Sequence, residues 1–454
     1  MPPTIRPRVK RRLPLKRLVR VLTIGGCVMA IAAMTLAGGA QAWTYKVLHD
    51  FCEGAQCEYS SSRAGVAMDA AGNLYGTADL DGQNQSGTLF ELSYDASKDK
   101  WQYTILHTFC SLKNCADGAE PADGVILDAD GNLYGIAPNG GSTGHGVFFE
   151  LTQAGDFQVL FNFCPNNDSC PDGSSPFGPL TYAGADDGAL YDGSSPIYGT
   201  AGTGGMFNGG TAFQISPPRN PTGKFASWTE SAFYSFDISA GAFGLTIGPP
   251  GTFYGVMSGP GGPNETGTAY ELVQTESGWT ESNLHFFCEG KLFLPCWDGA
   301  IPIGKLTIDR ATGTLFGIAQ LAAPGGGLIY ELTRRGSAWR YTILHHFCHR
   351  KCHDGSFPST GLTRDANGNL LGVTYLQGKG NGGSVFEVNR RPSGECKQTA
   401  CTAFGVLREF CLQTGCKDGG RSQAPLLIDR QGNIWGKTNR GGAYNGGVVF
   451  ELSP

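Results

Sequence analysis

Short apolar segments alternate with polar ones along almost the whole chain. Their valine, isoleucine, phenylalanine and tyrosine residues recur at every second position and are bounded by glycine-rich turns, which draw on 69 glycines in all. Period-two alternation between turn signals is typical of β-strands, and no stretch of useful length has the spacing of an amphipathic helix. The pattern therefore predicts an all-β protein.

One aromatic phrase recurs with constant spacing. It reads WTYKVLHDFC at 43–52, WQYTILHTFC at 101–110 and WRYTILHHFC at 339–348, with looser copies at 228–237 and 279–288. In all five copies the Trp and the closing Phe are eight residues apart. A repeat this regular indicates a tandem-repeat architecture.

Two further motifs follow each aromatic phrase. The first is a glycine-bounded Leu-Tyr or similar pair, at 72–76, 131–135, 197–199, 251–255, 313–317, 368–372 and 432–436. The second is Phe-Glu-Leu or a close variant, at 90–92, 149–151, 213–215, 270–272, 330–332, 386–388 and 450–452. The chain thus contains seven copies of about 60 residues. Each copy yields four strands: A before the glycine turn, B and C carrying the two motifs, and D as the aromatic phrase.

Four short strands per unit are typical of a propeller blade, and seven blades can close a ring. After residue 42 the chain begins with a D strand, and it ends just after a C strand. We therefore expect residues 43–51 to be the outer strand of blade 7, closing the ring by main-chain hydrogen bonds and covering two sheet edges. An open solenoid is the alternative, and it would rather carry polar caps at its ends. The predicted fold is an all-β, seven-bladed β-propeller with four-stranded blades over residues 43–454.

The first 42 residues have the pattern of a signal peptide. Eight Lys or Arg and no acid flank an apolar stretch at 21–36, and Ala40-Gln41-Ala42 precedes Trp43. A single membrane anchor is the alternative, but the apolar run is short for a span. The export route stays open, because the Arg11-Arg12 pair only partly fits a twin-arginine signal.

The charge of the remaining chain excludes two classes of partner. Removing the eight basic residues leaves 26 basic against 39 acidic ones, a net charge of −13. This excess repels phosphate backbones and anionic lipids, so we expect no nucleic acid and no membrane surface as partner. A secreted or periplasmic monomer is the expected form.

The repeated Gly-Asn-Leu-Tyr-Gly and Gly-x-Val-Phe-Glu-Leu phrases resemble the GloVer tandem-repeat family of exported bacterial proteins, over essentially all of 43–454. The resemblance implies export and a propeller-like β-repeat, and it implies no established activity. Many relatives carry a C-terminal sorting anchor. This sequence stops at Ser453-Pro454, so free secretion or periplasmic residence is expected.

Fourteen cysteines follow residue 42, and they form seven local pairs. Most pairs begin directly after strand D. An even count in an exported chain indicates disulfides, each stabilising the fold by roughly 2 kcal/mol. The pairs are Cys52/Cys57, Cys110/Cys115, Cys164/Cys170, Cys288/Cys296, Cys348/Cys352, Cys396/Cys401 and Cys411/Cys416. Zinc, or a loose haem-attachment string, is the alternative for the cluster His345, His346, Cys348, His349, Cys352 and His353.

An Asp-Gly pair follows five of the cysteine links. Propeller geometry places these links and the glycine-rich B–C loops on one face, around the mouth of a central channel. A ring of carboxylates there could bind calcium, a cationic ligand or a sugar. Alternatively, each Asp accepts backbone N–H groups in a turn. The residues are Asp117, Asp172, Asp298, Asp354 and Asp418.

Residues that break the repeat are the better candidates for a specific site. His145 and Arg440 lie in the B–C loops of blades 2 and 7, are unmatched in the other copies, and are expected to project toward the mouth. Blade 3 carries an insertion at 183–195 with three aspartates, which we interpret as a solvated loop. The repeated strand-C glutamates fit edge pairing better than general acid catalysis.

The sequence favours a binding function. It contains no nucleophile elbow, phosphate loop or nucleotide fingerprint. We expect an exported scaffold that binds a glycan, peptide or surface protein and needs no cofactor. The alternative is a secreted metal-dependent hydrolase, lactonase or polysaccharide lyase with a divalent cation at the channel mouth.

Overall fold

The computed structural model describes eleven stretches of the chain, and the predicted signal segment 1–42 lies outside them. They are residues 43–52, 63–82, 85–121, 123–166, 169–218, 227–237, 241–259, 266–288, 296–348, 351–390 and 402–454. Within these stretches, no helix has the length and apolar character that crossing a membrane requires. Three 3-10 turns, η1 (Lys113–Cys115), η2 (Ala185–Asp187) and η3 (Thr414–Cys416), are the only helical elements described.

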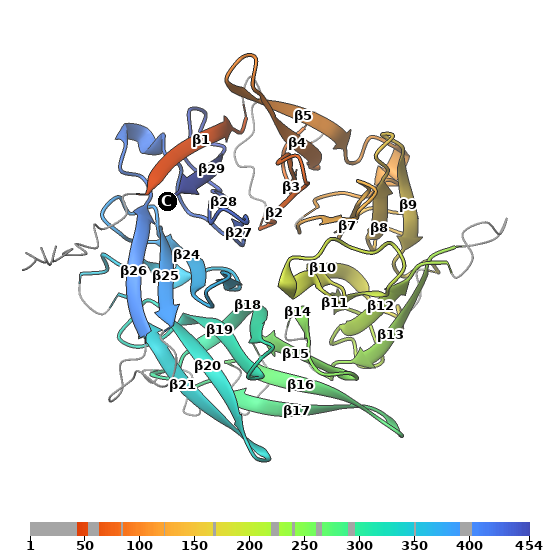
Figure 1. Cartoon of the computed structure of the whole chain (residues 1–454). Helices are drawn as coiled ribbons and strands as arrows, with labels where there is room; N and C mark the ends of the chain where they lie inside the picture. The colour runs from red at the N-terminus through yellow and green to blue at the C-terminus, as the bar shows by residue number, and fades with distance from the viewer. Residues whose placement is uncertain are drawn as a thin grey trace, which may run out of the picture. The chain divides into compact units, whose positions relative to one another are not determined.

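Seven antiparallel sheets surround a common centre (Figure 1). In blades 1 to 6 the strands follow one another in chain order from the centre outward, and this confirms the predicted seven-bladed propeller. Blade 1 contains β2 (Val66–Met68), β3 (Leu74–Ala78), β4 (Thr88–Asp95) and β5 (Lys100–Thr108). Blade 2 contains β6 (Ile126–Leu127), β7 (Leu133–Ala137), β8 (Val147–Leu151) and β9 (Phe157–Asn162). Blade 3 contains β10 (Ser174–Thr181), β11 (Ile197–Thr203), β12 (Thr211–Ser216) and β13 (Thr229–Ser235).

The other four blades repeat this order, with one interruption. Blade 4 contains β14 (Ala242–Ile247), β15 (Thr252–Met257), β16 (Thr268–Thr275) and β17 (Gly278–Phe286). Blade 5 contains β18 (Ala300–Asp309), β19 (Thr314–Leu321), β20 (Leu328–Arg335) and β21 (Ala338–His346). In blade 6 the inner strand is split into β22 (Ser356–Pro358) and β23 (Thr363–Arg364), which both pair with β24 (Leu370–Leu376); β25 (Ser384–Arg390) and β26 (Thr402–Glu409) follow. Blade 7 contains β27 (Leu427–Ile428), β28 (Ile434–Lys437), β29 (Val448–Ser453) and β1 (Thr44–Asp50).

The first strand completes the last blade, as predicted. β1 pairs with β29 in antiparallel register, Thr44 opposite Ser453 and Lys46 opposite Glu451. The backbone N–H of Phe51 then donates to the carbonyl of Gly447 at 3.0 Å. The outer edge of β29 is therefore covered by β1, and left open it could template association with other chains.

The closing Phe of the aromatic phrase is held in the same way in every blade. Its backbone N–H donates to the carbonyl of the glycine that precedes strand C of the same sheet. The pairs are Phe51/Gly447, Phe109/Gly87, Phe163/Gly146, Phe236/Gly210, Phe287/Gly267, Phe347/Gly327 and Phe410/Gly383. All seven rings are at most 1% exposed and lie in the apolar layers between neighbouring blades.

A glycine in strand B leaves room for the strand-C aromatic ring. A Cβ on Gly135 would lie 2.5 Å from the ring of Phe149, and one on Gly199 would lie 2.5 Å from the ring of Phe213. The tip of the ring therefore occupies the space that a Cβ on the glycine would need. This close packing explains why the Leu-Tyr-Gly and Phe-Glu-Leu motifs recur together.

Candidate functional site

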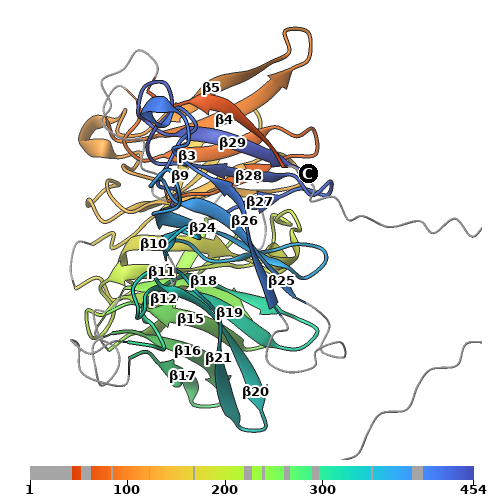
Figure 2. The ribbon, with the colours of Figure 1, turned by 90° about the vertical axis from the view of Figure 1, so that its left-hand side faces the viewer.

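The cysteine links and the B–C loops share one face of the ring, and we call it the link face. The carbonyl of the second cysteine accepts an N–H from the B–C loop of the blade that the link enters, at 2.8–2.9 Å. The pairs are Cys115/Gly141, Cys170/Gly205, Cys296/Ala323, Cys352/Gly378 and Cys416/Gly442. The side view in Figure 2 shows the strands crossing the thickness of the ring, so that the connections collect on its two faces.

Five of the predicted disulfides are present in the described residues. They are Cys110–Cys115, Cys164–Cys170, Cys288–Cys296, Cys348–Cys352 and Cys411–Cys416. The two other predicted pairs involve Cys57, Cys396 and Cys401, which lie outside the described residues. Cys348 and Cys352 thus form the disulfide that the sequence favours.

Four of the five predicted aspartates hold the cysteine links in place. Asp117 is 1% exposed and accepts backbone N–H groups from Ser111 at 3.0 Å and Leu112 at 3.2 Å. Its carboxylate also lies 3.2 Å from His107 Nε2. Burial alone would raise the pKa of Asp117, but the hydrogen bonds from Ser111 and Leu112 outweigh it and hold the pKa below its usual value.

The same arrangement recurs at three more links. Asp354 accepts from the backbone N–H of Cys348 and lies 2.9 Å from His345 Nε2, while Asp298 accepts from Cys288 N–H. Asp418 is fully buried and accepts from Leu412 and Gln413 N–H and from the guanidinium of Arg408. These hydrogen bonds are the ones expected if each Asp accepts backbone N–H groups in a turn. Binding of a ligand by these carboxylates stays a prediction.

A histidine meets three of these carboxylates, those of Asp117, Asp298 and Asp354, and it also stacks on the next blade. The ring of His107 lies parallel to Phe157, with centroids 3.6 Å apart. We call this unit of outer-strand histidine, link aspartate and next-blade aromatic ring the histidine clamp. It recurs as His285 on Tyr341 and His345 on Phe404. His49 stacks on Tyr103 in the same way, and Arg408 takes the histidine place against Tyr45.

The seam between blades 2 and 3 lacks the clamp. Phe161 occupies the histidine place, Glu230 occupies the aromatic place, and Asp172 is exposed. Neither carboxylate oxygen of Glu230 has a hydrogen-bond partner among the described residues. Burial, and then the charge of Asp172, raise the pKa of Glu230 to about 9. Asp172 therefore differs from the other four predicted aspartates in its surroundings.

A cavity of about 650 Å³ lies on the link face of blade 3 beside this seam. Its walls come from the B–C loop of blade 2, the link into blade 3, and blade 3 itself. They are formed by His145, Ser169, Cys170, Ser174, Thr203, Gly204, Gly205, Met206, Phe207 and Asn208. A second cavity of about 550 Å³, lined in part by His353, Lys379 and Arg408, lies along the outer strand of blade 6.

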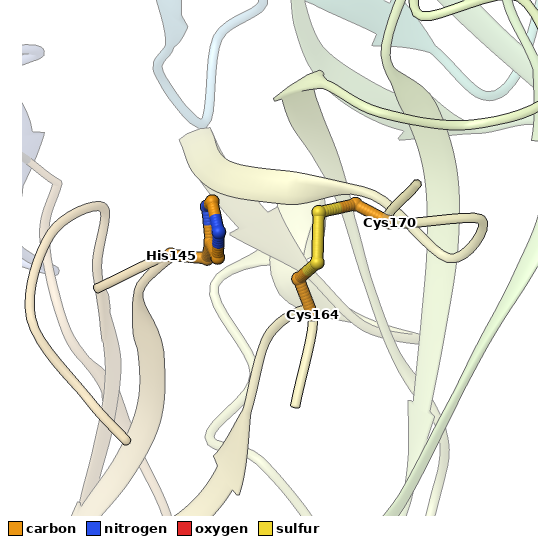
Figure 3. Close-up of side chains that lie close together, drawn as sticks. All are labelled: His145, Cys164 and Cys170. Carbon is orange, nitrogen blue, oxygen red and sulfur yellow. A yellow bond between two sulfur atoms is a disulfide. The ribbon is translucent and has the colours of Figure 1, made fainter. Parts of the chain in front are cut away.

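The two residues predicted from broken symmetry lie on the link face in different blades. The imidazole of His145 lies beside the Cys164–Cys170 disulfide, as Figure 3 shows, and the reactive atoms of the three side chains are within 4.8 Å of one another. The backbone of Arg440 is bridged to Gly420 in the link into blade 7. The structure does not bring His145 and Arg440 into one cavity among those described.

The blade 3 insertion is anchored to other blades. Asp186 lies 2.5 Å from Lys305 Nζ and Asp187 lies 2.9 Å from Arg310 Nε, both on or next to β18 and β19 of blade 5. The N–H of Tyr191 donates to the carbonyl of Leu127 in blade 2. Blade 4 lies between blades 3 and 5 in the ring, so the insertion must extend across the centre of the ring to reach blade 5. It follows strand A and so lies at the face opposite the link face, where its aspartates form ion pairs.

Large apolar side chains are exposed mainly on the link face. Among the described residues, the six most exposed ones all lie in cysteine links or B–C loops. They are Leu112 (58%), Met206 (80%), Phe207 (58%), Trp297 (59%), Leu412 (50%) and Tyr444 (49%).

Reasoning from the sequence did not identify Glu230 or these apolar residues. Glu230 had a partial signal, because WTE at 228–230 replaces the WTY, WQY or WRY of three other copies, although 279–281 also reads WTE. The apolar residues had none, since an isolated Leu or Trp in a loop does not reveal whether it folds back into the core.

The solved structures resemble this chain only at the level of the fold. The extracellular domain of a one-component system from B. thetaiotaomicron has a TM-score of 0.49 and 11% identity over 90% of this chain and 40% of its own. PorZ, a surface component of the type-IX secretion system of Porphyromonas gingivalis, has a TM-score of 0.45 and 11% identity over 87% and 46%. The polysaccharide lyase Uly1 has a TM-score of 0.46 and 9% identity over 86% and 89%. This chain thus spans less than half the length of the first two.

The repeats decide the family. No curated protein matches the sequence. The family model described as the Gloeobacter/Verrucomicrobia repeat matches residues 30–270 and again 242–454. These two matches cover nearly all of the ring and contain every repeated motif described above, so this chain belongs to the Gloeobacter/Verrucomicrobia repeat family.

Proposed function

We propose that this protein is an extracellular or envelope scaffold that binds a protein partner through its link face. The five described disulfides support a location outside the cytosol, where such bonds form and persist. The −13 charge of residues 43–454 argues against nucleic acid or anionic membrane as the partner.

The observation that carries the proposal is the concentration of exposed apolar side chains on one face. Apolar groups exposed next to one another often mark a binding surface, and Met206 and Phe207 are adjacent in one loop of this face. Trp297, Phe207 and Tyr444 are of the residue types enriched at protein interfaces, and Met206 adds a flexible apolar contact.

The distribution of these residues favours a protein over a small ligand. These residues belong to links or loops of four different blades, so a ligand held in a single pocket would not reach them together. They are Leu112 at blade 2, Met206 at blade 3, Trp297 at blade 5, and Leu412 and Tyr444 at blade 7. Aliphatic Leu and Met also offer nothing to the polar edges of a sugar. The disulfides and link aspartates hold the backbone of these loops, so little ordering entropy is lost on binding.

The experiment compares variants that differ in the face they alter. A link-face variant carries Phe207→Ser, Trp297→Ser and Leu412→Ser. Its matched control carries Tyr94→Ser and Leu190→Ser, two exposed apolar residues on the opposite face. Both are used to capture proteins from the exported fraction of the source organism and to probe a glycan array.

We expect a defined protein to be captured by the wild type and the control and to be lost, by at least tenfold in affinity, with the link-face variant. Equal capture by all three proteins, or saturable glycan binding that the link-face substitutions leave unchanged, would contradict the proposal. Circular dichroism of both variants verifies that the substitutions have not altered the fold.

A further inference from the structure

In the described part of the chain, one histidine lies directly beside a disulfide. His145 comes from the B–C loop of blade 2, and Cys164 and Cys170 form the link into blade 3. One ring nitrogen of His145 and the two sulfur atoms lie within 4.8 Å of one another (Figure 3). The imidazole is thus the neighbour of both sulfur atoms.

The outer-strand histidines of the clamps are positioned differently. His107, His285 and His345 direct Nε2 to a link aspartate and not to the sulfur atoms. At the seam between blades 2 and 3 the corresponding outer-strand residue is Phe161, so no clamp histidine is present there. A histidine from another element instead approaches the disulfide itself.

The cavity gives a small thiol access to this disulfide. Cys164 and Cys170 are only 4% and 7% exposed, but Cys170 and His145 both line the 650 Å³ cavity. The other lining side chains are uncharged: Ser169, Ser174, Thr203, Met206, Phe207 and Asn208. An anionic thiolate entering here therefore meets no carboxylate in the cavity wall.

We propose that Cys164–Cys170 is an exchange-reactive disulfide whose departing sulfur is protonated by His145. The thiolate of a low-molecular-weight thiol attacks Sγ of Cys170 and forms a mixed disulfide. The Cys164–Cys170 bond breaks, its electron pair moves to Cys164 Sγ, and the His145 imidazolium gives that sulfur a proton. One disulfide is lost and one is formed, so no external oxidant is needed.

The neighbouring His145 imidazole is the reason why we expect this disulfide to exchange faster than the others. Exchange is faster when the departing thiol has a low pKa, and a neighbouring imidazolium lowers the pKa of a thiol. A stabilised leaving thiolate accelerates exchange by several-fold to about tenfold. Thiol exchange at Cys164–Cys170 goes beyond partner binding, and it would make the link face sensitive to thiols.

The test uses the other disulfides of the same molecule as references. The oxidised protein is incubated with limiting glutathione. Free thiols are then trapped with an alkylating label, and the label and the glutathione adduct at each cysteine are quantified by peptide mass spectrometry. We expect the label on Cys164 and the glutathione adduct on Cys170 to appear about tenfold faster than label or adduct at the Cys110–Cys115 and Cys411–Cys416 pairs. Equal rates, or faster reaction of another pair, would overturn the proposal.

A pair of variants separates proton donation from a change in access. His145→Gln keeps a polar side chain of similar size but cannot donate a proton as an imidazolium does, and it is expected to slow exchange at Cys164 and Cys170 several-fold. The matched control is His353→Gln, which replaces the residue directly after Cys352 and is expected to change no rate at Cys164 and Cys170. The proposal fails if His145→Gln leaves the rate unchanged, or if His353→Gln slows it equally.

Discussion

His107 of β5 and Phe157 of β9 lie parallel across the seam between blades 1 and 2, with ring centroids 3.6 Å apart and planes 3° apart. The same imidazole lies 3.2 Å from the buried carboxylate of Asp117. One side chain therefore connects the outer strand of one blade, the link that leaves it, and the outer strand of the next blade. The repeated histidine is explained by this connection between neighbouring units, which each blade by itself would not require.

Replacing the clamp histidine should destabilise the ring. In His107→Ala, the stack on Phe157 is lost, and Asp117 loses one of its partners while remaining buried. We expect the free energy of unfolding to fall by about 2 kcal/mol, measured by urea denaturation. His145→Ala, outside any clamp, is the control and should change it by less than about 0.5 kcal/mol. Similar losses in the two variants would contradict the clamp.

His49 should make the ring closure sensitive to acid. Burial lowers the pKa of His49 to about 4, although Asp50 and Asp81 act in the opposite direction. The unfolded chain takes up this proton near pH 6.5 and the folded chain only near pH 4, so the free energy of unfolding falls as the pH is lowered between these values. The contribution is at most about 3 kcal/mol.

His49→Phe keeps a flat ring on Tyr103 and removes the imidazole that takes up the proton. Its free energy of unfolding should therefore decline less than that of the wild type between about pH 7 and pH 4. Urea unfolding of both proteins over this range measures the difference. Parallel pH curves would show that His49 titrates alike in the folded and unfolded chains.

Glu230 should have the opposite pH dependence. Its pKa is raised to about 9 by burial and by Asp172, so the folded chain keeps a proton that the unfolded chain releases near pH 4.5. The free energy of unfolding therefore falls as the pH rises from about 4.5 to 9. Glu230→Gln has no carboxylate to ionise, so its free energy of unfolding should not fall in this way. The variant should be more stable than the wild type by several kcal/mol at about pH 8, and by little at about pH 4.5.

Thermal and urea unfolding of the two proteins at both pH values measure this effect. The measurement is repeated with and without a chelator, because a bound cation would offset the carboxylate charge. Equal stability of wild type and Glu230→Gln at about pH 8 in the presence of chelator would contradict the burial argument.

The first strand should be required for a monomeric ring. Removal of residues 43–50 deletes β1 and leaves the outer edge of β29 unpaired. We expect a lower thermal midpoint and concentration-dependent association, measured by light scattering, because an open strand edge pairs with other chains. A synthetic peptide of residues 43–52 should restore both properties by adding the missing strand, whereas a peptide with the same composition in scrambled order should not. A truncated protein that stays monomeric without the peptide would contradict this role.

The sequence by itself determined the repeat and, through it, the fold. Period-two apolar positions, glycine turns and the Trp-to-Phe spacing act within one blade, so seven copies predicted seven sheets, the strand order within each and the completion of blade 7 by residues 43–51. The local cysteine pairs were predictable for the same reason, because neighbours in one short link meet whatever the rest of the chain does.

Only the tertiary structure decided what each seam and loop does. Three arrangements join residues of different units: His107 stacks on Phe157, His145 lies beside the Cys164–Cys170 disulfide, and Asp186 reaches Lys305. A fourth is the burial of Glu230, whose carboxylate has no hydrogen-bond partner among the described residues. Motif spacing cannot predict such contacts, since they depend on the angle and distance between blades. Exposure of Trp297 and Met206 is likewise set by how their loops fold, and local sequence does not encode it.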